Sequence, residues 1–320
     1  MRALVTGGAG FIGSILVDRM LAEGHEVDAI DDLSSGSLAN LAEARTDRAR
    51  RFTFHRMDIR SPATVDYLVQ RRPEVVFHLA GQSDPRVSMT KPALDAEVNV
   101  IGSLHVLQGA ASAGSRKVIF TSSGGAIYGP VEELPTKELH PQRPVLPSGI
   151  AKKVVADYLH FYREVHGLDY TNLVLGHVYG PRQNPDAETG VVARFTGRMI
   201  ARERPTIYGD GRQTRDLVFV DDAVDALVRS VDRAPGLMIN VGTGRETSVQ
   251  DLYDTLARLL QYKEPARHSP ARAGDIARSA LDSSRAEIHL GWTAFTSLEA
   301  GLRQTIEWFR ASGVARQRRM

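Results

Sequence analysis

The sequence predicts an α/β fold in which helices cover both faces of a doubly wound parallel sheet, with a smaller lobe toward the C-terminal end. Three observations predict it. Short runs rich in β-branched residues alternate with helical stretches over the first 180 residues, a rhythm typical of βαβ units. A glycine-rich segment follows the first of these runs. After about residue 180 the alternation loosens into longer polar loops.

The expected strands are apolar at successive positions, which is typical of strands buried between two helical layers. The runs Val75 to Phe77 and Val118 to Phe120 contain no polar residue. We therefore expect strands at residues 3–6, 26–30, 75–79 and 117–121, and a first helix at residues 11–23.

The second part of the chain is expected to form a lobe over the carboxyl edge of the sheet, where ligands bind in open α/β folds. Polar loops at residues 180–185, 208–211 and 265–274 separate its helices, and long loops in a compact protein are often functional. We place a first domain at residues 1–180 and the lobe mainly at residues 181–320. Later segments such as Leu217 to Val220 could rejoin the first domain.

The composition excludes several classes of function. The 40 Lys and Arg residues nearly balance the 38 Asp and Glu residues, so the net charge of +2 creates no field that would recruit nucleic acid or an acidic membrane. No cysteine is present, which excludes disulfides and thiolate ligands, and we expect no metal site. Signal-peptide blocks are missing at the start, and no apolar run approaches the roughly 20 residues that span a bilayer. We expect a cytoplasmic protein without a membrane partner.

The glycine-rich segment Thr6 to Gly13 predicts a Rossmann-type dinucleotide site, because it lies between a strand and a helix. Gly7 permits the tight turn, Gly10 lets a pyrophosphate approach the N–H groups of the helix start, and Gly13 lets the helix lie close to the strand. The two residues that begin the helix, Phe11 and Ile12, belong to the same predicted site.

An acidic residue after the second strand predicts NAD as the cofactor. Asp31 lies eighteen residues beyond Gly13, where a carboxylate accepts hydrogen bonds from the adenosine ribose and repels a 2′-phosphate. The following residues, which include Asp32, Ser35 and Gly36, contain no arginine that would neutralise that phosphate. After the third strand, Asp58 and Ile59 are candidates for the adenine side, although a lone Asp at a strand end is as often a helix cap.

Motifs along nearly the whole chain resemble those of the extended short-chain dehydrogenase/reductase family, and within it the UDP-glucose 4-epimerases. The matching stretches are Val5 to Gly13, Phe77 to Gln82, Asn99 to Gly102, Thr121 to Gly129, Val178 to Gln183, Gly209 to Gly211, Thr214 to Asp222 and Asn240 to Gly244. The resemblance implies further cofactor-binding residues, which are Leu79, Ala80, Gly81, Gln82, Asn99, Ser122 and Lys152.

The resemblance also implies a reaction and its catalytic residues. In such epimerases a tyrosinate takes the proton from the sugar O4 while NAD accepts hydride from C4, and the 4-keto sugar turns and takes the hydride back on its other face. A lysine one helical turn later lowers the pKa of the tyrosine. In this chain the lysine is Lys152 and the strand-end hydroxyl is Ser123, but the tyrosine position holds Ser148. A serine hydroxyl is shorter and far less acidic than a phenol, so it cannot simply replace it.

A second departure lies beside the sugar. His177 stands where the resemblance places an asparagine. A histidine with an ordinary pKa near 6.5 could accept a proton from a sugar hydroxyl, although a histidine that hydrogen-bonds phosphate or backbone fits the position as well. The substrate-side residues implied by the resemblance are Val191, Thr206, Tyr208, Arg215, Arg272 and Asp275, with the arginines on the diphosphate, Asp275 on the uridine ribose, and Thr206 and Tyr208 near the uracil.

Three hypotheses follow from Ser148. The chain is a UDP-hexose 4-epimerase whose tyrosine was lost by engineering or by natural change, with water, Ser123 or His177 in its place. Alternatively, it is another NAD-dependent sugar-nucleotide enzyme, although Ser123 to Gly125 lacks the acid that dehydratases carry there. The third hypothesis is a protein that binds NAD and nucleotide sugar without turnover. By analogy with relatives, helices near residues 91–113 and 150–166 would pair in a homodimer, although their apolar stripes could equally face the core.

Overall fold

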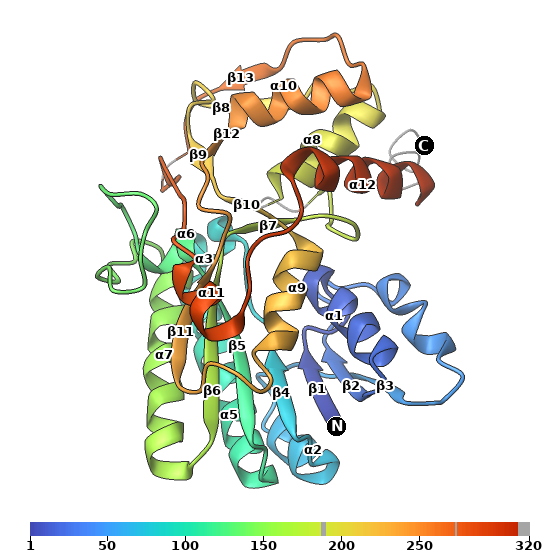
Figure 1. The fold of residues 1–320 in the computed structure, drawn as a ribbon, viewed down its shortest axis with the longest axis vertical. Helices are drawn as coiled ribbons and strands as arrows, with labels where there is room; N and C mark the ends of the chain where they lie inside the picture. The colour runs from blue at the N-terminus through green and yellow to red at the C-terminus, as the bar shows by residue number, and fades with distance from the viewer. Residues whose placement is uncertain (187–189, 273, 313–320) are drawn as a thin grey trace.

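The computed structural model describes residues 1–186, 190–272 and 274–312, and it confirms the predicted α/β fold (Figure 1). A seven-stranded sheet has the order β11-β6-β5-β4-β1-β2-β3, and every neighbouring pair is parallel. The strands are β1 (Arg2–Thr6), β2 (Glu26–Asp31), β3 (Phe52–Arg56), β4 (Val75–His78), β5 (Lys117–Ser123), β6 (Asp169–Leu175) and β11 (Leu237–Val241).

Helices cover both faces of this sheet because successive strand residues point to opposite sides. Leu4 packs in one hydrophobic cluster with Leu68 and Val106, whereas its neighbour Val5 packs in another with Leu16 and Val224. The first layer contains α2 (Ala63–Arg71), α5 (Gly102–Ala113) and α7 (Pro147–His166), and the second contains α1 (Phe11–Ala22), α9 (Val220–Arg229) and α11 (Ser284–Leu290).

The strand order reverses at β1, which lies between β2 and β4. In open α/β sheets the carboxyl ends of the strands on either side of such a point enclose a crevice. A buried histidine fixes the two central strands there, because the ring of His78 hydrogen-bonds Thr6 Oγ1 and Ser103 Oγ, both at 2.8 Å. Burial lowers the pKa of His78 to about 3, so the ring is neutral.

Short elements surround this edge of the sheet. They are the helices α3 (Pro85–Thr90), α4 (Pro92–Ala96) and α6 (Gly124–Ile127), the 3-10 helices η1 (Leu38–Leu41) and η2 (Ala44–Thr46), and a π-helical turn η3 (Glu97–Ile101). The π turn leads directly into α5, and it places Asn99 at the sheet edge. Such turns are rare, and they occur frequently at functional sites.

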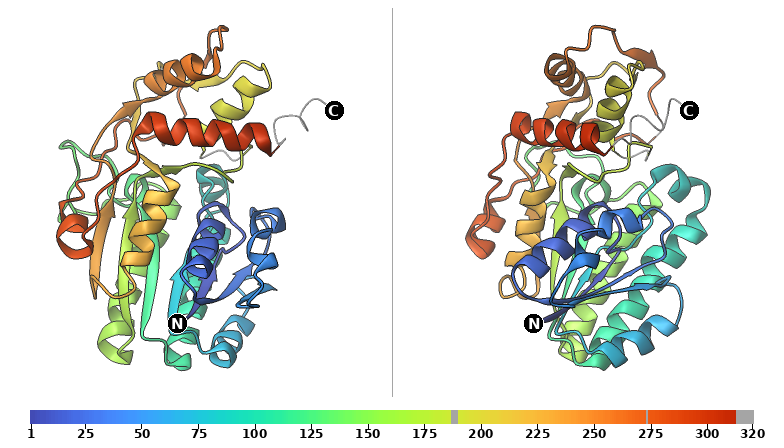
Figure 2. Two further views of the ribbon diagram at one scale, coloured as in Figure 1. Left: turned by 45° about the vertical axis from the view of Figure 1, so that its right-hand side comes forward. Right: turned by 90° about the vertical axis from the view of Figure 1, so that its right-hand side faces the viewer.

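The C-terminal lobe lies beyond the carboxyl ends of the strands (Figure 2). It contains α8 (Val191–Ile200), α10 (Val249–Leu260) and α12 (Leu298–Ala311). Three two-stranded sheets join it to the rest: β8 (Thr206–Tyr208) with β13 (Arg267–Ser269), β9 (Thr214–Arg215) with β12 (Thr247–Ser248), and β7 (His177–Tyr179) with β10 (Leu217–Phe219).

The segment from Leu217 forms β10, which pairs with β7, and continues into α9, which packs against α1 on one face of the main sheet. The later strand β11 joins the main sheet itself. Two expectations differ from the structure in detail. The loop expected at residues 265–274 contains β13, whose pairing with β8 no local pattern indicates. The strand expected to reach Leu79 ends at His78, because the N–H of Leu79 turns toward Thr6.

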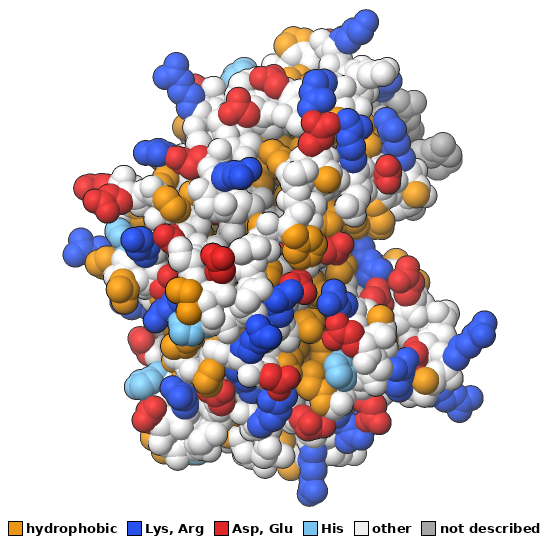
Figure 3. Space-filling model, in the orientation of Figure 1, with side chains coloured by type: hydrophobic (Ala, Val, Ile, Leu, Met, Phe, Trp, Pro, Cys, Tyr) orange, Lys and Arg blue, Asp and Glu red, His pale blue; other side chains and the backbone are white. Residues whose placement is uncertain are grey.

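Charges of both signs are interspersed on the face that Figure 3 shows, in agreement with the small net charge of the sequence. Within the described ranges, no helix is both long and apolar enough to cross a membrane. The same residues contain no group of three or more His, Cys, Asp or Glu side chains placed to hold a metal ion.

Candidate functional site

The glycine turn between β1 and α1 is held by close backbone contacts. Gly7 has a φ of +69°, and its N–H donates to the carbonyl of Ile30 at 2.9 Å. A Cβ at Gly13 would lie 2.1 Å from the carbonyl oxygen of Gly7, whereas a Cβ at Gly10 would meet only that oxygen, at 3.1 Å. Positions 7 and 13 therefore require glycine for the turn to form. At position 10 the absence of a side chain leaves the outer surface of the turn open to a ligand.

The start of α1 suits a pyrophosphate. Gly10 is the N-cap, no side chain caps the helix, and its first turn contains no acidic residue. The N–H groups of the first helical turn therefore meet no acidic side chain of that turn, and the positive end of the helix dipole favours an anion there. Phe11 and Ile12 begin the helix at this point. This observation shows that the residues present fit a dinucleotide.

Asp31 connects the end of β2 to the glycine turn. Its carboxylate accepts hydrogen bonds from the N–H groups of Ala9 at 3.0 Å and Leu33 at 2.8 Å. A Cβ at Gly36 would lie 2.9 Å from the same carboxylate, so the following loop comes close to it. Burial raises the pKa of Asp31, and the two backbone hydrogen bonds oppose that rise. Ser35 is exposed on this loop.

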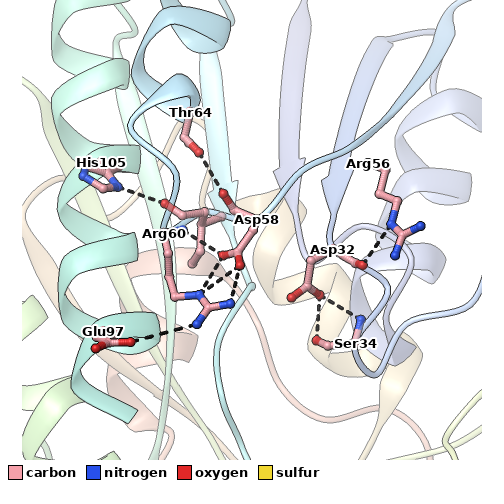
Figure 4. A network of polar contacts seen from close by, with 9 residues as sticks. Asp32, Ser34, Arg56, Asp58, Arg60, Thr64, Glu97 and His105 are labelled. Carbon is pink, nitrogen blue, oxygen red and sulfur yellow. Dashed lines mark hydrogen bonds and ion pairs between the residues drawn. The ribbon is translucent and has the colours of Figure 1, made fainter. Parts of the chain in front are cut away.

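Figure 4 shows the ends of β2 and β3, where the adenine side is predicted. The carboxylate of Asp32 accepts from the N–H and hydroxyl of Ser34, at 2.8 and 2.6 Å. The carboxylate of Asp58 is paired with the guanidinium of Arg60, whose hydrogen bonds lower the pKa of Asp58. Arg56 also reaches this edge, with Nε donating to the carbonyl of Asp32 at 3.3 Å.

Sequence reasoning missed Arg56 and Arg60, because it searched for an arginine only among the residues that directly follow Asp31. Arg56 comes from β3, directly opposite Asp31 in the strand register. The side chain of Ile59 packs against Gly102 in the core, and its carbonyl hydrogen-bonds the ring of His105 at 3.0 Å. A cofactor contact from position 59 is thus limited to its backbone.

The loop after β4 faces the glycine turn. The hydroxyl of Thr6 accepts from the N–H groups of Leu79 and Ala80, at 3.2 and 3.1 Å. A Cβ at Gly7 would lie 2.8 Å from the backbone nitrogen of Ala80. The structure therefore brings the two predicted cofactor segments, which are distant in sequence, into contact.

The side chain of Lys152 lies under this loop. Its Nζ donates to the carbonyl of Thr121 at 2.9 Å and lies 4.5 Å from the centre of the Phe120 ring. Burial lowers the pKa of Lys152 to about 8, and the carboxyl group of Asp95 opposes that fall. A lysine of this kind exchanges a proton near neutral pH.

Ser148 lies one helical turn before Lys152 on α7, so both project from one face of the helix. Its N–H donates to Ser88 Oγ at 2.9 Å. Ser122 and Ser123 end β5 on the adjacent strand, and the buried hydroxyl of Ser122 has no hydrogen-bond partner among the described residues. The structure thus gathers the hydroxyl and amine groups of the predicted catalytic set at one edge.

His177 begins β7, which follows β6 directly in the chain. Its N–H donates to the carbonyl of Asp216 at 2.6 Å, and its buried Nε2 has no partner in the described part of the chain. Burial, followed by the charges of Arg215 and Arg194, lowers the pKa of His177 to about 4. The ring is therefore neutral, and one nitrogen is free to hydrogen-bond a ligand.

The predicted substrate residues of the lobe come together in two groups. Arg215 donates from Nη1 to the carbonyls of Thr214 and Ile276, both at 2.7 Å, and its Nη2 lies 3.8 Å from Asp275. Burial lowers the pKa of Arg215, and Asp275 opposes that fall.

The guanidinium of Arg272 lies 3.6 Å from the centre of the Tyr208 ring. Tyr208 ends β8, on which Thr206 lies two residues earlier. Val191 is buried at the first turn of α8. Arg194, on the same helix, lies 5.9 Å from the Tyr208 ring and acts on His177, and no sequence pattern indicated it.

Comparisons with known proteins show which family and fold this chain resembles. A model of the NAD dependent epimerase/dehydratase family matches residues 3–242. A UDP-glucose 4-epimerase of Mycolicibacterium smegmatis is 45% identical, over 97% of this chain and 99% of that protein. A putative UDP-glucose 4-epimerase of Methanocaldococcus jannaschii is 35% identical, over 96% of this chain and 98% of that protein.

Two solved structures superpose closely. The UDP-glucose 4-epimerase of Thermotoga maritima, with UDP-glucose, has a TM-score of 0.94 at 43% identity and covers 98% of this chain and 99% of its own. The Thermus thermophilus UDP-glucose 4-epimerase in complex with NAD has a TM-score of 0.91 at 35% identity and covers 98% of this chain and 100% of its own.

Proposed function

The chain belongs to the NAD-dependent epimerase/dehydratase family, and from this premise we propose that it acts on a UDP-hexose as a 4-epimerase. The observation that carries the proposal is a convergence at one sheet edge. The uncapped start of α1 follows β1, the half-buried Lys152 contacts the carbonyl of Thr121 on β5, and the lobe contributes Arg215 and Arg272. These groups would suit a dinucleotide and a nucleotide sugar.

NAD, when bound, would accept hydride from C4 of the sugar and return it to the opposite face. This chain's residues would hold the reactants for that exchange. The start of α1 would hold the pyrophosphate, Asp31 the adenosine ribose, and Lys152 the nicotinamide ribose. Arg215 and Arg272 would bind the diphosphate of the sugar nucleotide, because guanidinium groups match phosphate oxygens in geometry.

Proton transfer is where this chain departs from the family's chemistry. The sugar O4 must lose a proton as C4 is oxidised, and Ser148 supplies an alcohol where a phenol is needed. Ser123 and His177 are the neighbouring groups that would hydrogen-bond the sugar. Because the pKa of His177 is lowered to about 4, we infer that it positions the sugar as a neutral ring and acts only as a weak base.

Restoration of the phenol tests the proposal. We expect Ser148→Tyr to raise the rate of interconversion of UDP-glucose and UDP-galactose by about 10²- to 10⁴-fold, the usual contribution of a general acid–base group. The epimers are separated by chromatography, and NADH absorbance is followed in the same samples. Lys153→Tyr, which adds a phenol at the next position after Lys152 on α7, is the control. Absence of a gain in Ser148→Tyr would eliminate the 4-epimerase proposal.

A non-catalytic binding protein is the second candidate, and the loss of the phenol is the observation that favours it. This alternative requires that the starting chain binds NAD and UDP-hexose tightly and turns over neither. Calorimetry with each ligand, together with the rate of the unmodified chain, separates the two candidates, because an epimerase retains a measurable rate.

We also propose a homodimer through α5 and α7. Four apolar residues on the outer face of α7 are exposed, at 51% for Ile150, 38% for Tyr158, 44% for Phe161 and 62% for Val165. Their spacing places them along one stripe of the helix, and Ile101, just before α5, is 47% exposed. Contiguous apolar surface of this kind is typical of a protein–protein interface.

A further inference from the structure

A buried carboxyl group near Lys152 has no role in the chemistry described so far. Asp95, on α4, is only 1% exposed. Its Oδ1 accepts a hydrogen bond from Asn99 Nδ2 at 3.1 Å, while its Oδ2 is buried without a hydrogen-bond partner among the described residues. Burial of a carboxyl group is costly unless nearby charges or hydrogen bonds compensate. Its presence here therefore requires a reason.

Asn99 connects this carboxyl group to the lysine. Its side chain accepts from the N–H of Gln82 at 2.8 Å and donates to the carbonyl of the same residue at 3.0 Å. A Cβ at Gly81 would lie 2.8 Å from Asn99 Oδ1 and 3.6 Å from Lys152 Nζ. The asparagine amide and the lysine amine therefore both lie close to Gly81, and the π turn η3 presents the asparagine there.

The charged groups around Lys152 are few. Asp95 is the acidic group that acts on it, from α4. His78, on β4, is neutral because burial lowers its pKa to about 3. From β5, the carbonyl of Thr121 accepts one hydrogen bond, and the ring of Phe120 faces the amine. From η3, the uncharged amide of Asn99 lies near the same glycine, Gly81.

We propose that Asp95 is a positioning residue for proton transfer, which through Asn99 holds Lys152 in place and keeps its amine able to accept and to donate a proton at neutral pH. Burial lowers the pKa of the amine, and Asp95 opposes this effect. The role in turnover rests on the proposed 4-epimerase function, whereas the effect on the titration of Lys152 does not.

The inferred proton path is balanced. As C4 is oxidised, the O4 proton passes to the Ser148 oxygen while the Ser148 proton passes to the neutral amine of Lys152. The serine ends unchanged, and the ammonium returns the proton by the same path when C4 is reduced. An alcohol of ordinary pKa can relay a proton but cannot store one, so storage falls to Lys152, which projects from the same face of α7.

Direct titration of Lys152 tests the proposed effect of Asp95 on the protonation of the lysine amine. The chain contains six lysines, so NMR of protein labelled with ¹³C at the lysine ε-carbon resolves them, and Lys152→Arg assigns the signal. We expect Lys152 to titrate near pH 8, and we expect Asp95→Asn to lower that midpoint by about one pH unit, as loss of a nearby opposite charge does. Asp95→Glu should retain most of the original midpoint.

Asp157→Asn is the matched control, because it removes an exposed carboxyl group from α7 itself. An unchanged Lys152 midpoint in Asp95→Asn would overturn the proposal. Should that variant not fold, Asn99→Ala takes its place, since it removes the link between the two groups. An unchanged midpoint there overturns the proposal equally.

Activity then separates this inference from the proposed function. In the unmodified chain, where Lys152 would store the proton, Asp95→Asn should shift the acid limb of the pH profile of kcat downward by the same amount as the lysine midpoint, an effect that a merely structural role would not produce. If the lysine shifts but no variant epimerises a UDP-hexose, the effect of Asp95 on the lysine stands and the proposed function fails. If epimerisation is observed but Asp95→Asn leaves the acid limb of the pH profile of kcat unchanged, the proposed role of Asp95 in proton transfer fails.

Discussion

The cofactor edge and the sugar edge of this site lie side by side, and they differ in what they require of the sequence. The cofactor edge depends on backbone: Gly7 and Gly13 are held by contacts that admit no side chain, and Asp31 accepts two backbone N–H groups. The proposed sugar edge depends on side chains, those of Ser148 and His177, while the backbone of Ser148 is fixed by Ser88. The comparison teaches that the glycine turn constrains residue identity through backbone contacts, whereas the proposed sugar edge leaves the side-chain chemistry open to change.

The largest effect of a substitution, on both the free energy of unfolding and NAD binding, is expected at the cofactor edge. Gly13→Ala places a Cβ 2.1 Å from the carbonyl oxygen of Gly7, so we expect the free energy of unfolding to fall by about 3 kcal/mol and bound NAD to be lost. Chemical denaturation and the NAD content of the purified protein measure both. Gly10→Ala, with a single contact at 3.1 Å, should lose NAD while it keeps its stability. Equal stability of both variants would contradict this account of the turn.

The next effect is expected on the substrate side. Arg215→Ala removes a half-buried guanidinium, with a side chain that is 19% exposed, from the proposed diphosphate site, and hydrogen bonds to charged groups contribute about 1.5–3 kcal/mol. We expect the Kd for UDP, measured by calorimetry, to rise about 10- to 150-fold. Arg212→Ala is the control, because the Arg212 side chain is 90% exposed. Similar affinities for the two variants would remove Arg215 from the site.

A smaller effect is expected from His177 on stability against pH. The pKa of His177 is about 4 in the folded protein and near 6.5 in an unfolded chain. The unfolded state therefore binds more protons between these values, and the free energy of unfolding falls as the pH drops from 6.5 to 4, by up to about 3 kcal/mol from this group. We expect His177→Asn to flatten that fall in denaturant titrations, whereas the exposed His160→Asn should not. Parallel curves for His177→Asn and the unmodified chain would contradict the neutral ring.

The smallest effect on the site is expected from the outer face of α7. Phe161→Glu places a charge in the exposed apolar stripe, so we expect the mass measured by light scattering to fall to that of a monomer. NAD binding should change less than about twofold, because the cofactor edge lies at the other end of α7. Phe295→Glu, at a residue that is 64% exposed outside the stripe, is the control. An unchanged mass would argue against this interface.

Sequence reasoning succeeded where a residue's role depends on its immediate neighbours. The turn at Gly7, the helix that starts after Gly10, and the place of Ser148 one turn before Lys152 follow from spacing alone. It failed where the partner is distant. The pairing of β8 with β13 joins residues about sixty apart, and Arg56 reaches Asp32 from another strand.

By itself, the sequence determined the α/β class, the glycine turn and the place of Ser148 one turn before Lys152, and it predicted NAD from Asp31, because each rests on local backbone geometry or on the chemistry of a single side chain. Only the tertiary structure decided how these groups act together. It placed the buried carboxyl group of Asp95 and the amide of Asn99 beside Lys152, and Arg215 near His177. Burial and neighbouring charge set the proton affinity of a side chain, and both are properties of the folded chain.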